Sequence, residues 1–189
     1  MELLLIIVAL AVVVAVAWIF NRLVALRNRA QNAWSDIDVQ LKQRHDLIGS
    51  LVEVVKGYAR HERQTLEEVT ALRTEAEGIR KQGSPADAGK AESKLGKRIR
   101  RLFAVVEAYP ELKASENFLG LHRALVDVED KIQNARRYYN AVVRDLNTRI
   151  QSVPDLLVAK PLGFREREFF ELDSEAEAAV PKIDLGDTS

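Results

Sequence analysis

The stretch that decides the fold is Leu3–Phe20, LLLIIVALAVVVAVAWIF, an unbroken run of 18 apolar residues near the N-terminus. As a helix it would be about 27 Å long, close to the ~30 Å hydrocarbon core of a bilayer. Trp18 stands near its end, where an indole ring favours the membrane interface, and Arg22 follows the apolar pattern. The run predicts a transmembrane helix over residues 1–22, with residues 3–20 in contact with the lipid bilayer.

Two other interpretations of this run are open. Ala15-Val16-Ala17 has the small-x-small pattern of a signal-peptide cleavage site, but the residues before the run, Met1-Glu2, carry no Lys or Arg. The run is also long for the apolar part of a signal peptide. A core helix that is apolar on every side needs a large protein around it, and 189 residues are too few to supply one. A membrane anchor is therefore favoured.

The charges next to the run predict its orientation. No Lys or Arg precedes it, whereas Arg22, Arg27 and Arg29 follow within ten residues. Positively charged flanks stay in the cytoplasm. We expect a single-pass protein of the bacterial inner (cytoplasmic) membrane, with a periplasmic N-terminus and a cytoplasmic body.

The body begins with a helical pattern over residues 23–80 that contains no proline. Apolar residues recur in steps of three and four, which is typical of a helix with one buried face. That face comprises Trp34, Ile37, Leu41, Ile48, Leu51, Val55 and Tyr58, continued by Leu66, Val69, Leu72 and Ala76. The stretch 61–65 between them is wholly polar, so we expect the buried face to shift there within one continuous helix.

Two further helices are predicted, over residues 85–108 and 112–153. Ser84 suits the N-cap of the first and Pro85 its first position, while Pro110 stops it. The second has a heptad pattern of apolar residues over four heptads, which indicates left-handed helix packing. Its members are Phe118, Leu121, Leu125, Val128, Ile132, Ala135, Tyr139, Val142 and Leu146.

The predicted fold class is all-α: the transmembrane helix continues into an antiparallel bundle of three to four long helices, over residues 23–172. A short helical turn is expected at residues 155–160 and an irregular segment at 161–172, whose aromatic residues fold back onto the bundle. A long intermolecular coiled coil is the competing arrangement, and the prolines at the turns argue against it. The acidic residues 173–189 are predicted to be disordered.

No set of residues indicates catalysis. His61-Glu62 lacks the second histidine that a zinc-protease motif requires, since position 65 is threonine. Glu67-Glu68 and Glu129-Asp130 are adjacent pairs that we interpret as solvated faces. The chain has no cysteine, which excludes disulfides and thiolate metal sites. We expect no enzymatic activity, no catalytic, cofactor-binding or metal-binding residues, and no cofactor.

Three polar residues fall near the predicted buried faces: Arg44 in the first helix, and Asn140 and Asn147 one heptad apart in the last. They either bind something or form a hydrogen-bonded layer that fixes how the helices pair, and we favour the layer.

A basic cluster, Lys97-Arg98 with Arg100-Arg101, suits phospholipid headgroups, nucleic acid or plain solvent. No aromatic residues are interleaved with it, and 28 acidic residues balance 28 basic ones in the chain. We therefore expect no nucleic-acid partner, and we favour a solvated face.

Several specific strings stand between about residue 20 and 172. In the first half they are Arg27-Asn28, Ala33-Trp34-Ser35-Asp36-Ile37-Asp38-Val39-Gln40-Leu41-Lys42, Asp46-Leu47-Ile48, Leu51-Val52, Val55-Lys56-Gly57-Tyr58-Ala59 and His61-Glu62. Later come Tyr109-Pro110-Glu111-Leu112-Lys113-Ala114-Ser115-Glu116-Asn117-Phe118, Ala135-Arg136-Arg137-Tyr138-Tyr139-Asn140, Asn147-Thr148, Ile150 and Arg167-Glu168-Phe169-Phe170. Together these strings resemble the LemA family of bacterial proteins.

The resemblance implies one membrane helix with its N-terminus outside, a cytoplasmic helical bundle, and no assigned enzymatic activity. Family members include magnetosome-associated proteins, and others occur beside membrane metallopeptidases or proteins of envelope stress, which hints at such partners here. We expect a non-enzymatic scaffold or adaptor at the cytoplasmic face, with an unidentified membrane or cytoplasmic protein as its partner. The alternative is a self-assembling membrane-organising protein, a homo-oligomer formed through lateral helix contacts.

Overall fold

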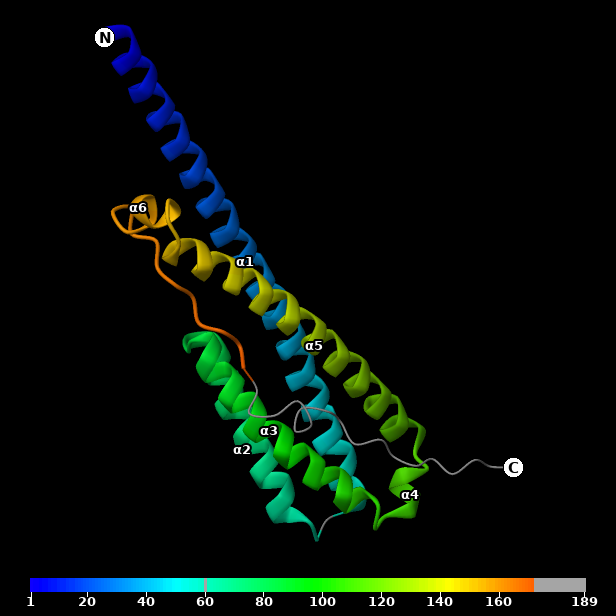
Figure 1. Cartoon of the computed structure of the whole chain (residues 1–189). Coiled ribbons are helices and arrows are strands. Elements are labelled where there is room, and N and C mark those ends of the chain that lie inside the picture. Colours follow the sequence, from blue (N-terminus) through cyan, green and yellow to red (C-terminus); the bar gives the residue numbers. More distant parts are fainter. Residues whose placement is uncertain (60, 172–189) are drawn as a thin grey trace. The chain divides into compact units, whose positions relative to one another are not determined.

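A computed structural model describes residues 1–59 and 61–171. Every regular element in these residues is a helix (Figure 1). The helices are α1 (Glu2–Tyr58), α2 (Arg63–Gln82), α3 (Pro85–Val106), α4 (Pro110–Lys113), α5 (Glu116–Gln151) and α6 (Asp155–Ala159). The all-α prediction, in which an apolar N-terminal helix continues into long antiparallel helices, is confirmed. The predicted disordered tail, 173–189, lies outside the described residues.

The chain divides into two compact units. The anchor unit comprises Met1–Asp36 and Ala135–Phe169, and therefore contains the first part of α1, the second part of α5, and α6. The bundle unit comprises Ile37–Asn134 together with Phe170 and Glu171.

Consecutive helices of the bundle unit run antiparallel. For α1 and α2, Arg73 meets His45 and Arg80 meets Asp38. For α2 and α3, Lys94 meets Glu75 and Arg98 meets Glu68. The core contains fully buried side chains from each of its four longer helical segments. These include Ile48, Leu51, Val69, Leu95, Leu102, Phe103 and Phe118.

The prediction of a single helix over residues 23–80 is wrong. Helix α1 ends at Tyr58 and α2 begins at Arg63. A helix that continued past the polar stretch 61–65 would leave Leu66 and Val69 without neighbours, whereas the reversal places both in the core. Tyr58, which the pattern placed on the buried face, is 47% exposed because it is the last residue before this turn.

The boundaries of the other helices follow local chemistry. Ser84 caps α3, since its Oγ accepts a hydrogen bond from the Asp87 amide at 3.3 Å, and Pro85 takes the first helical position. The segment predicted as one helix over 112–153 is divided into α4 and α5, which begins at Glu116. The aromatic residues after α6 return to the protein: Phe170 is fully buried and Phe164 is partly buried.

Candidate functional site

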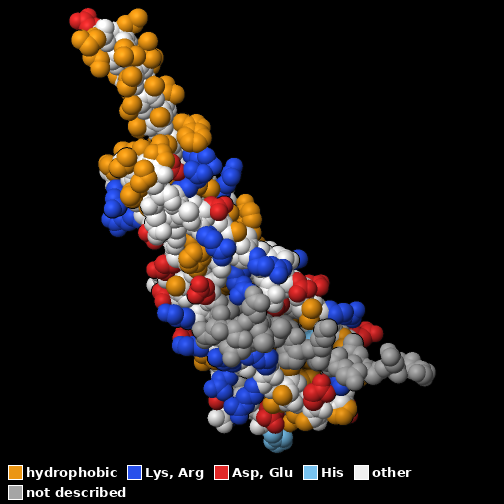
Figure 2. All heavy atoms as spheres, in the orientation of Figure 1, with side chains coloured by type: hydrophobic (Ala, Val, Ile, Leu, Met, Phe, Trp, Pro, Cys, Tyr) orange, Lys and Arg blue, Asp and Glu red, His pale blue; other side chains and the backbone are white. Residues whose placement is uncertain are grey.

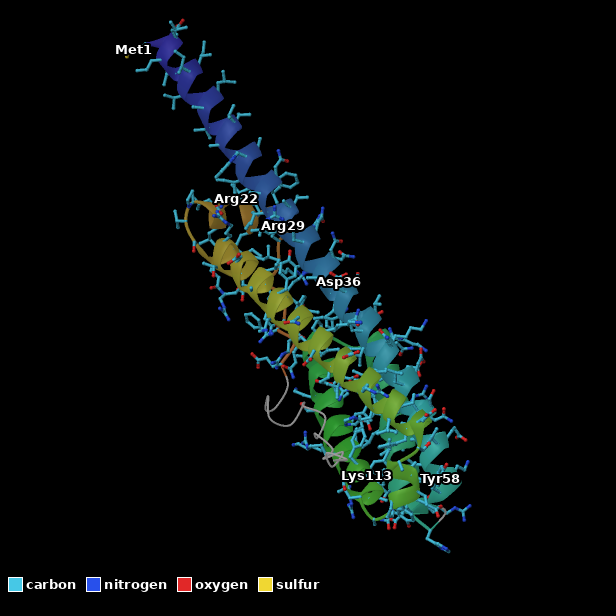
Figure 3. All side chains as sticks on the ribbon, turned by 90° about the vertical axis from the view of Figure 1, so that its right-hand side faces the viewer. Met1, Arg22, Arg29, Asp36, Tyr58 and Lys113 are labelled. Atoms are coloured by element: carbon cyan, nitrogen blue, oxygen red, sulfur yellow. The ribbon has the colours of Figure 1, made fainter. Side chains whose placement is uncertain are left out.

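The N-terminal part of α1 has the exposure of a membrane helix. Every side chain from Met1 to Trp18 is exposed. Figure 3 shows these side chains projecting from the ribbon between Met1 and Arg22, and Figure 2 shows the same length covered with hydrophobic atoms. By length and composition α1 is able to cross a membrane, and it is the only helix of the described residues that meets this test.

Aromatic and arginine side chains gather where the apolar run ends. The Arg22 guanidinium lies over the Trp18 ring, 5.1 Å from its centroid. The Phe164 ring meets Phe20 edge-on at 5.9 Å, and the Arg27 guanidinium lies 5.5 Å from the Phe164 centroid. Such contacts combine an apolar ring with a charge that stays hydrated, which suits the boundary between lipid and water.

The bundle unit contains a buried charged cluster of Arg44, His45, Glu92 and Glu129. The Arg44 guanidinium lies 3.0 Å from a Glu92 oxygen and 3.4 Å from a Glu129 oxygen. His45 Nε2 lies 2.7 Å from the other Glu92 oxygen. All four residues are at most 4% exposed in side chain, so this cluster is closed to water.

The cluster joins three helices, because Arg44 and His45 come from α1, Glu92 from α3 and Glu129 from α5. Taking charges out of water is costly, and it is offset only when each charge meets a fixed partner. The cluster therefore specifies which helices pair and at what level. The interpretation of Glu129 as part of a solvated face is wrong, since burial beside Arg44 gives its carboxylate a charged partner. Sequence reasoning also did not single out His45 or Glu92.

The two asparagines belong to the anchor unit. Asn147 pairs with the main chain of Arg167: its Nδ2 donates to the Arg167 carbonyl and its Oδ1 accepts from the Arg167 amide, both at 2.9 Å. Asn140 is partly buried and also has an interaction partner. The contacts of Asn147 therefore agree with a structural role rather than with ligand binding. Its side chain satisfies the backbone hydrogen-bonding groups of the extended segment after α6.

Tyr139 fixes the same extended segment. Its hydroxyl donates to the Glu168 carbonyl at 2.9 Å, and its ring lies 5.6 Å from that of Trp34. Burial raises the pKa of the Tyr139 phenol, because the charged phenolate loses hydration there.

The other candidates have ordinary surroundings. His61 is exposed in the turn after α1, and His122 packs against Phe103 and Phe118. In the basic cluster on α3, Arg98 forms an ion pair with Glu68 of α2 at 2.9 Å, which links two helices. Hence Glu68 is partly buried rather than fully solvated.

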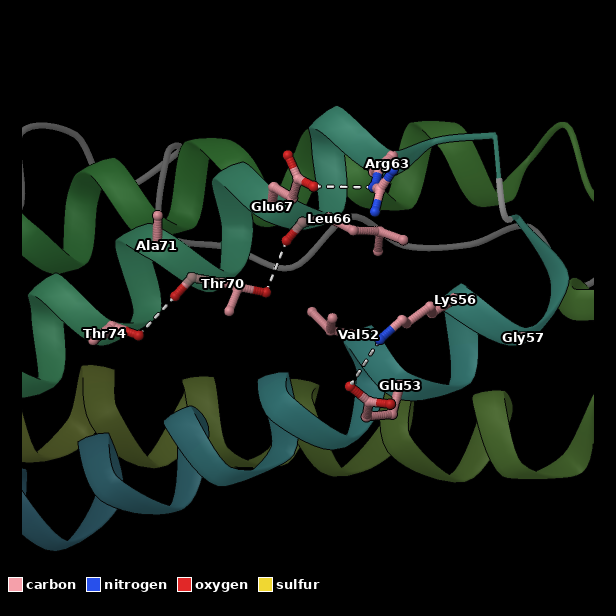
Figure 4. A pocket seen from close by; sticks show the side chains of 10 residues that line it. All are labelled: Val52, Glu53, Lys56, Gly57, Arg63, Leu66, Glu67, Thr70, Ala71 and Thr74. Carbon is pink, nitrogen blue, oxygen red and sulfur yellow. Dashed lines mark hydrogen bonds and ion pairs between the residues drawn. The ribbon is translucent and has the colours of Figure 1, made fainter.

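A groove of about 1080 Å³ lies between α1 and α2 in the bundle unit (Figure 4). Val52, Leu66 and Ala71 contribute apolar surface to it. Its other lining residues are glycine, charged residues or threonine: Glu53, Lys56, Gly57, Arg63, Glu67, Thr70 and Thr74. The groove therefore combines apolar surface with a polar rim, as protein interfaces do.

The sequence matches the model of the LemA family over residues 33–185, which is most of the chain. The protein belongs to the LemA family.

Two kinds of relative are similar to this LemA-family chain. Magnetosome protein MamQ of Magnetospirillum gryphiswaldense is 28% identical over 174 residues, which cover 80% of this chain and 64% of MamQ. Protein LemA of Metamycoplasma hominis is 27% identical over 170 residues, which cover 89% of this chain and 74% of that protein. This chain thus spans less than two thirds of the length of the MamQ protein.

Some of the strings that carry the LemA resemblance meet in the anchor unit. Trp34 contacts Tyr139, which bonds Glu168, and Asn147 bonds Arg167. Trp34, Tyr139 and Asn147 therefore have a structural role, because they join α1, α5 and the segment after α6.

Proposed function

We propose that this LemA-family protein is a single-pass, non-enzymatic scaffold or adaptor of the bacterial inner membrane, with its N-terminus in the periplasm and its helical body in the cytoplasm. The observation that carries the proposal is α1 itself. The apolar run of 18 residues, all exposed except Ile19, continues without a break in the helix into 38 further helical residues up to Tyr58. We infer that the first part of this helix spans the membrane and that the rest provides packing surface for the other helices.

The buried charged cluster supports a non-enzymatic role. Catalysis needs titratable groups that reach a substrate. The carboxylates and the imidazole of the Arg44 cluster are enclosed by packed helices instead. The groove between α1 and α2 is the surface we assign to the partner, an unidentified membrane or cytoplasmic protein; the family resemblance suggests a membrane metallopeptidase or an envelope-stress protein.

The anchor and its orientation are tested with single cysteines, because the chain has none of its own. Glu2→Cys and Lys131→Cys are expressed in a bacterium, and intact spheroplasts are treated with a membrane-impermeant maleimide. We expect labelling at position 2 only. Labelling at position 131 in intact cells contradicts the orientation, and recovery of a chain lacking residues 3–20 in the membrane fraction contradicts the anchor.

Adaptor function is tested by photo-crosslinking in living cells. A photoreactive phenylalanine replaces Thr70 or Thr74 in the groove, or Lys131 on α5 as an exposed control. We expect adducts of one defined size from the groove positions and none from position 131. Equal adducts at all three positions contradict a specific groove. Adducts of twice the chain mass favour the alternative, a self-assembling membrane-organising protein.

A further inference from the structure

The anchor unit has a second exposed apolar surface besides the N-terminal helix. Val153 is 72% exposed, Leu157 69% and Leu162 53%. Helix α6 is amphipathic at this point, because Val158 and Ala159 are buried while Leu157 points outward. We call Val153, Leu157 and Leu162 the α6 apolar surface.

The α6 apolar surface lies beside the end of the apolar run in α1. Phe164, two residues after Leu162, packs edge-on against Phe20. Ile19 is only 6% exposed, although the 18 residues before it are all exposed. Protein therefore covers α1 already at residues that belong to the predicted lipid-spanning run. Figure 2 shows hydrophobic atoms gathered where the bare helix meets the rest of the anchor unit, with basic side chains on either side.

An arginine cleft of about 610 Å³ lies in the same unit, between α1 and α5. Its lining includes Arg22 and Arg29 from α1, and Arg144 and Arg149 from α5. Asp145 also lines it, and Asp155 pairs with Arg149 at 2.7 Å. Four arginines against two aspartates leave a net charge of +2. Guanidinium groups match the geometry of phosphate oxygens.

We propose that the α6 apolar surface and the arginine cleft together form a second membrane-contact site, which enters the headgroup region of an anionic leaflet next to α1. The α6 apolar surface meets the upper acyl chains, and the cleft binds lipid phosphates. This inference rests on the proposed transmembrane anchor, which brings the site to the bilayer. An amphipathic surface flanked by arginine residues is typical of proteins that bind the membrane interface. The continuity of this surface with α1 favours lipid over a protein partner.

The test uses the full chain reconstituted in vesicles of equimolar phosphatidylglycerol and phosphatidylcholine. An environment-sensitive nitrobenzoxadiazole dye is attached to Leu157→Cys. Val12→Cys, in the anchor, is the positive control, and Lys131→Cys, exposed on α5, is the aqueous control. Lipids brominated on the upper acyl chain then report whether each dye reaches them. Leu157 is a surface side chain, so its replacement leaves the fold intact, which circular dichroism verifies.

We expect a blue-shifted, bromine-quenched emission at positions 12 and 157, and neither at position 131. Quenching at 157 should fall in Arg29→Gln/Arg144→Gln, and in vesicles of phosphatidylcholine alone, while quenching at 12 persists. Quenching at 12 without quenching at 157 overturns this inference and leaves the anchor standing. Absence of quenching at both positions overturns the anchor itself. A blue shift at 157 that bromine does not quench indicates contact with a second copy of the chain and also overturns the inference.

Discussion

The anchor unit and the bundle unit hold their segments together in different ways. In the bundle unit, amphipathic helices bury side chains such as Leu102 and Phe103 around the Arg44 cluster. In the anchor unit, an extended segment is held by hydrogen bonds from Tyr139 and Asn147 to its main chain. An extended segment has no internal hydrogen bonds, so buried backbone groups must find side-chain partners. Helices satisfy their own backbone and need partners mainly for their side chains.

The two units also differ in what they expose. Among the described residues, the large exposed hydrophobic side chains of the bundle unit are Val39 and Tyr58. The anchor unit exposes most of the N-terminal apolar run, Tyr138 and the α6 apolar surface. Among the described residues, exposed apolar side chains are therefore concentrated in the anchor unit.

The largest effect should come from the charged cluster of the bundle unit. Arg44→Met leaves Glu92 and Glu129 buried without their arginine, so we expect it to lower the free energy of unfolding by about 3–5 kcal/mol. The matched control is Lys56→Met, whose ion pair with Glu53 is exposed, and we expect a change of at most about 0.5 kcal/mol there. Urea unfolding of the full chain in detergent micelles, followed by circular dichroism, measures both. Equal effects would mean that burial of the cluster has no energetic consequence.

A close approach in the bundle unit should give the next effect. A Cβ built on Gly89 would clash with the carbonyl oxygen of Glu171, which is a backbone atom. We expect Gly89→Ala to destabilise the protein by about 1–3 kcal/mol and to speed cleavage after Glu171 by a glutamyl protease.

Gly78→Ala is the paired control for that substitution. Gly78 is exposed within α2 and no atom would meet its Cβ within 4 Å. Alanine there should stabilise the protein by up to about 1 kcal/mol, because only the helix propensity changes. If both alanines stabilise, the contact between Gly89 and the C-terminal segment is not maintained in solution.

Removal of the two hydrogen bonds between Asn147 and the main chain of Arg167 should destabilise the anchor unit. Asn147→Ala leaves the amide and carbonyl of Arg167 without their partner, at an expected cost of about 1–3 kcal/mol. Hydrogen exchange, followed by mass spectrometry, should show faster exchange of the Arg167 amide. Asn147→Asp keeps the acceptor for that amide and should retain part of its protection. Unchanged exchange in Asn147→Ala would show that the segment is held by other contacts.

The smallest effect concerns pH. The folded protein has a Tyr139 pKa above the ordinary value of 10.0, so the unfolded chain loses this proton first as the pH rises. The contribution of Tyr139 to stability is complete below pH 10.0 and declines through the pKa of the folded state. Unfolding curves of the wild type and Tyr139→Phe should therefore converge above that pH. A constant difference across the range would contradict a titrating Tyr139.

Local chemistry made part of this structure predictable. The apolar run, the Ser84 cap and the heptad residues Phe118, Leu125 and Ile132 depend on neighbours a few residues apart. The polar stretch 61–65 signalled a change in the buried face. It could not distinguish a register shift from a reversal, because that depends on which helix α2 meets.

The candidate sites were less predictable for the same reason. Arg44 and Asn147 stood out as polar residues near apolar faces, but their partners could not be named. Glu92 lies 48 residues from Arg44 along the chain, and Arg167 lies 20 from Asn147. Glu129 was interpreted as an ordinary surface carboxylate because the periodicity of one helix carries no information about a charged partner on another helix, here Arg44.

By itself, the sequence determined that the chain is helical, that its N-terminal residues are apolar enough for lipid, and that it belongs with LemA proteins. These three conclusions depend on composition and short-range spacing, which are properties of each segment taken alone. Only the tertiary structure decided that α1 ends at Tyr58, that four charged residues share one buried site, and that Phe164 brings the α6 apolar surface to the end of the apolar run. Those outcomes depend on contacts between segments far apart in the chain, because burial and charge pairing take effect only where such segments meet.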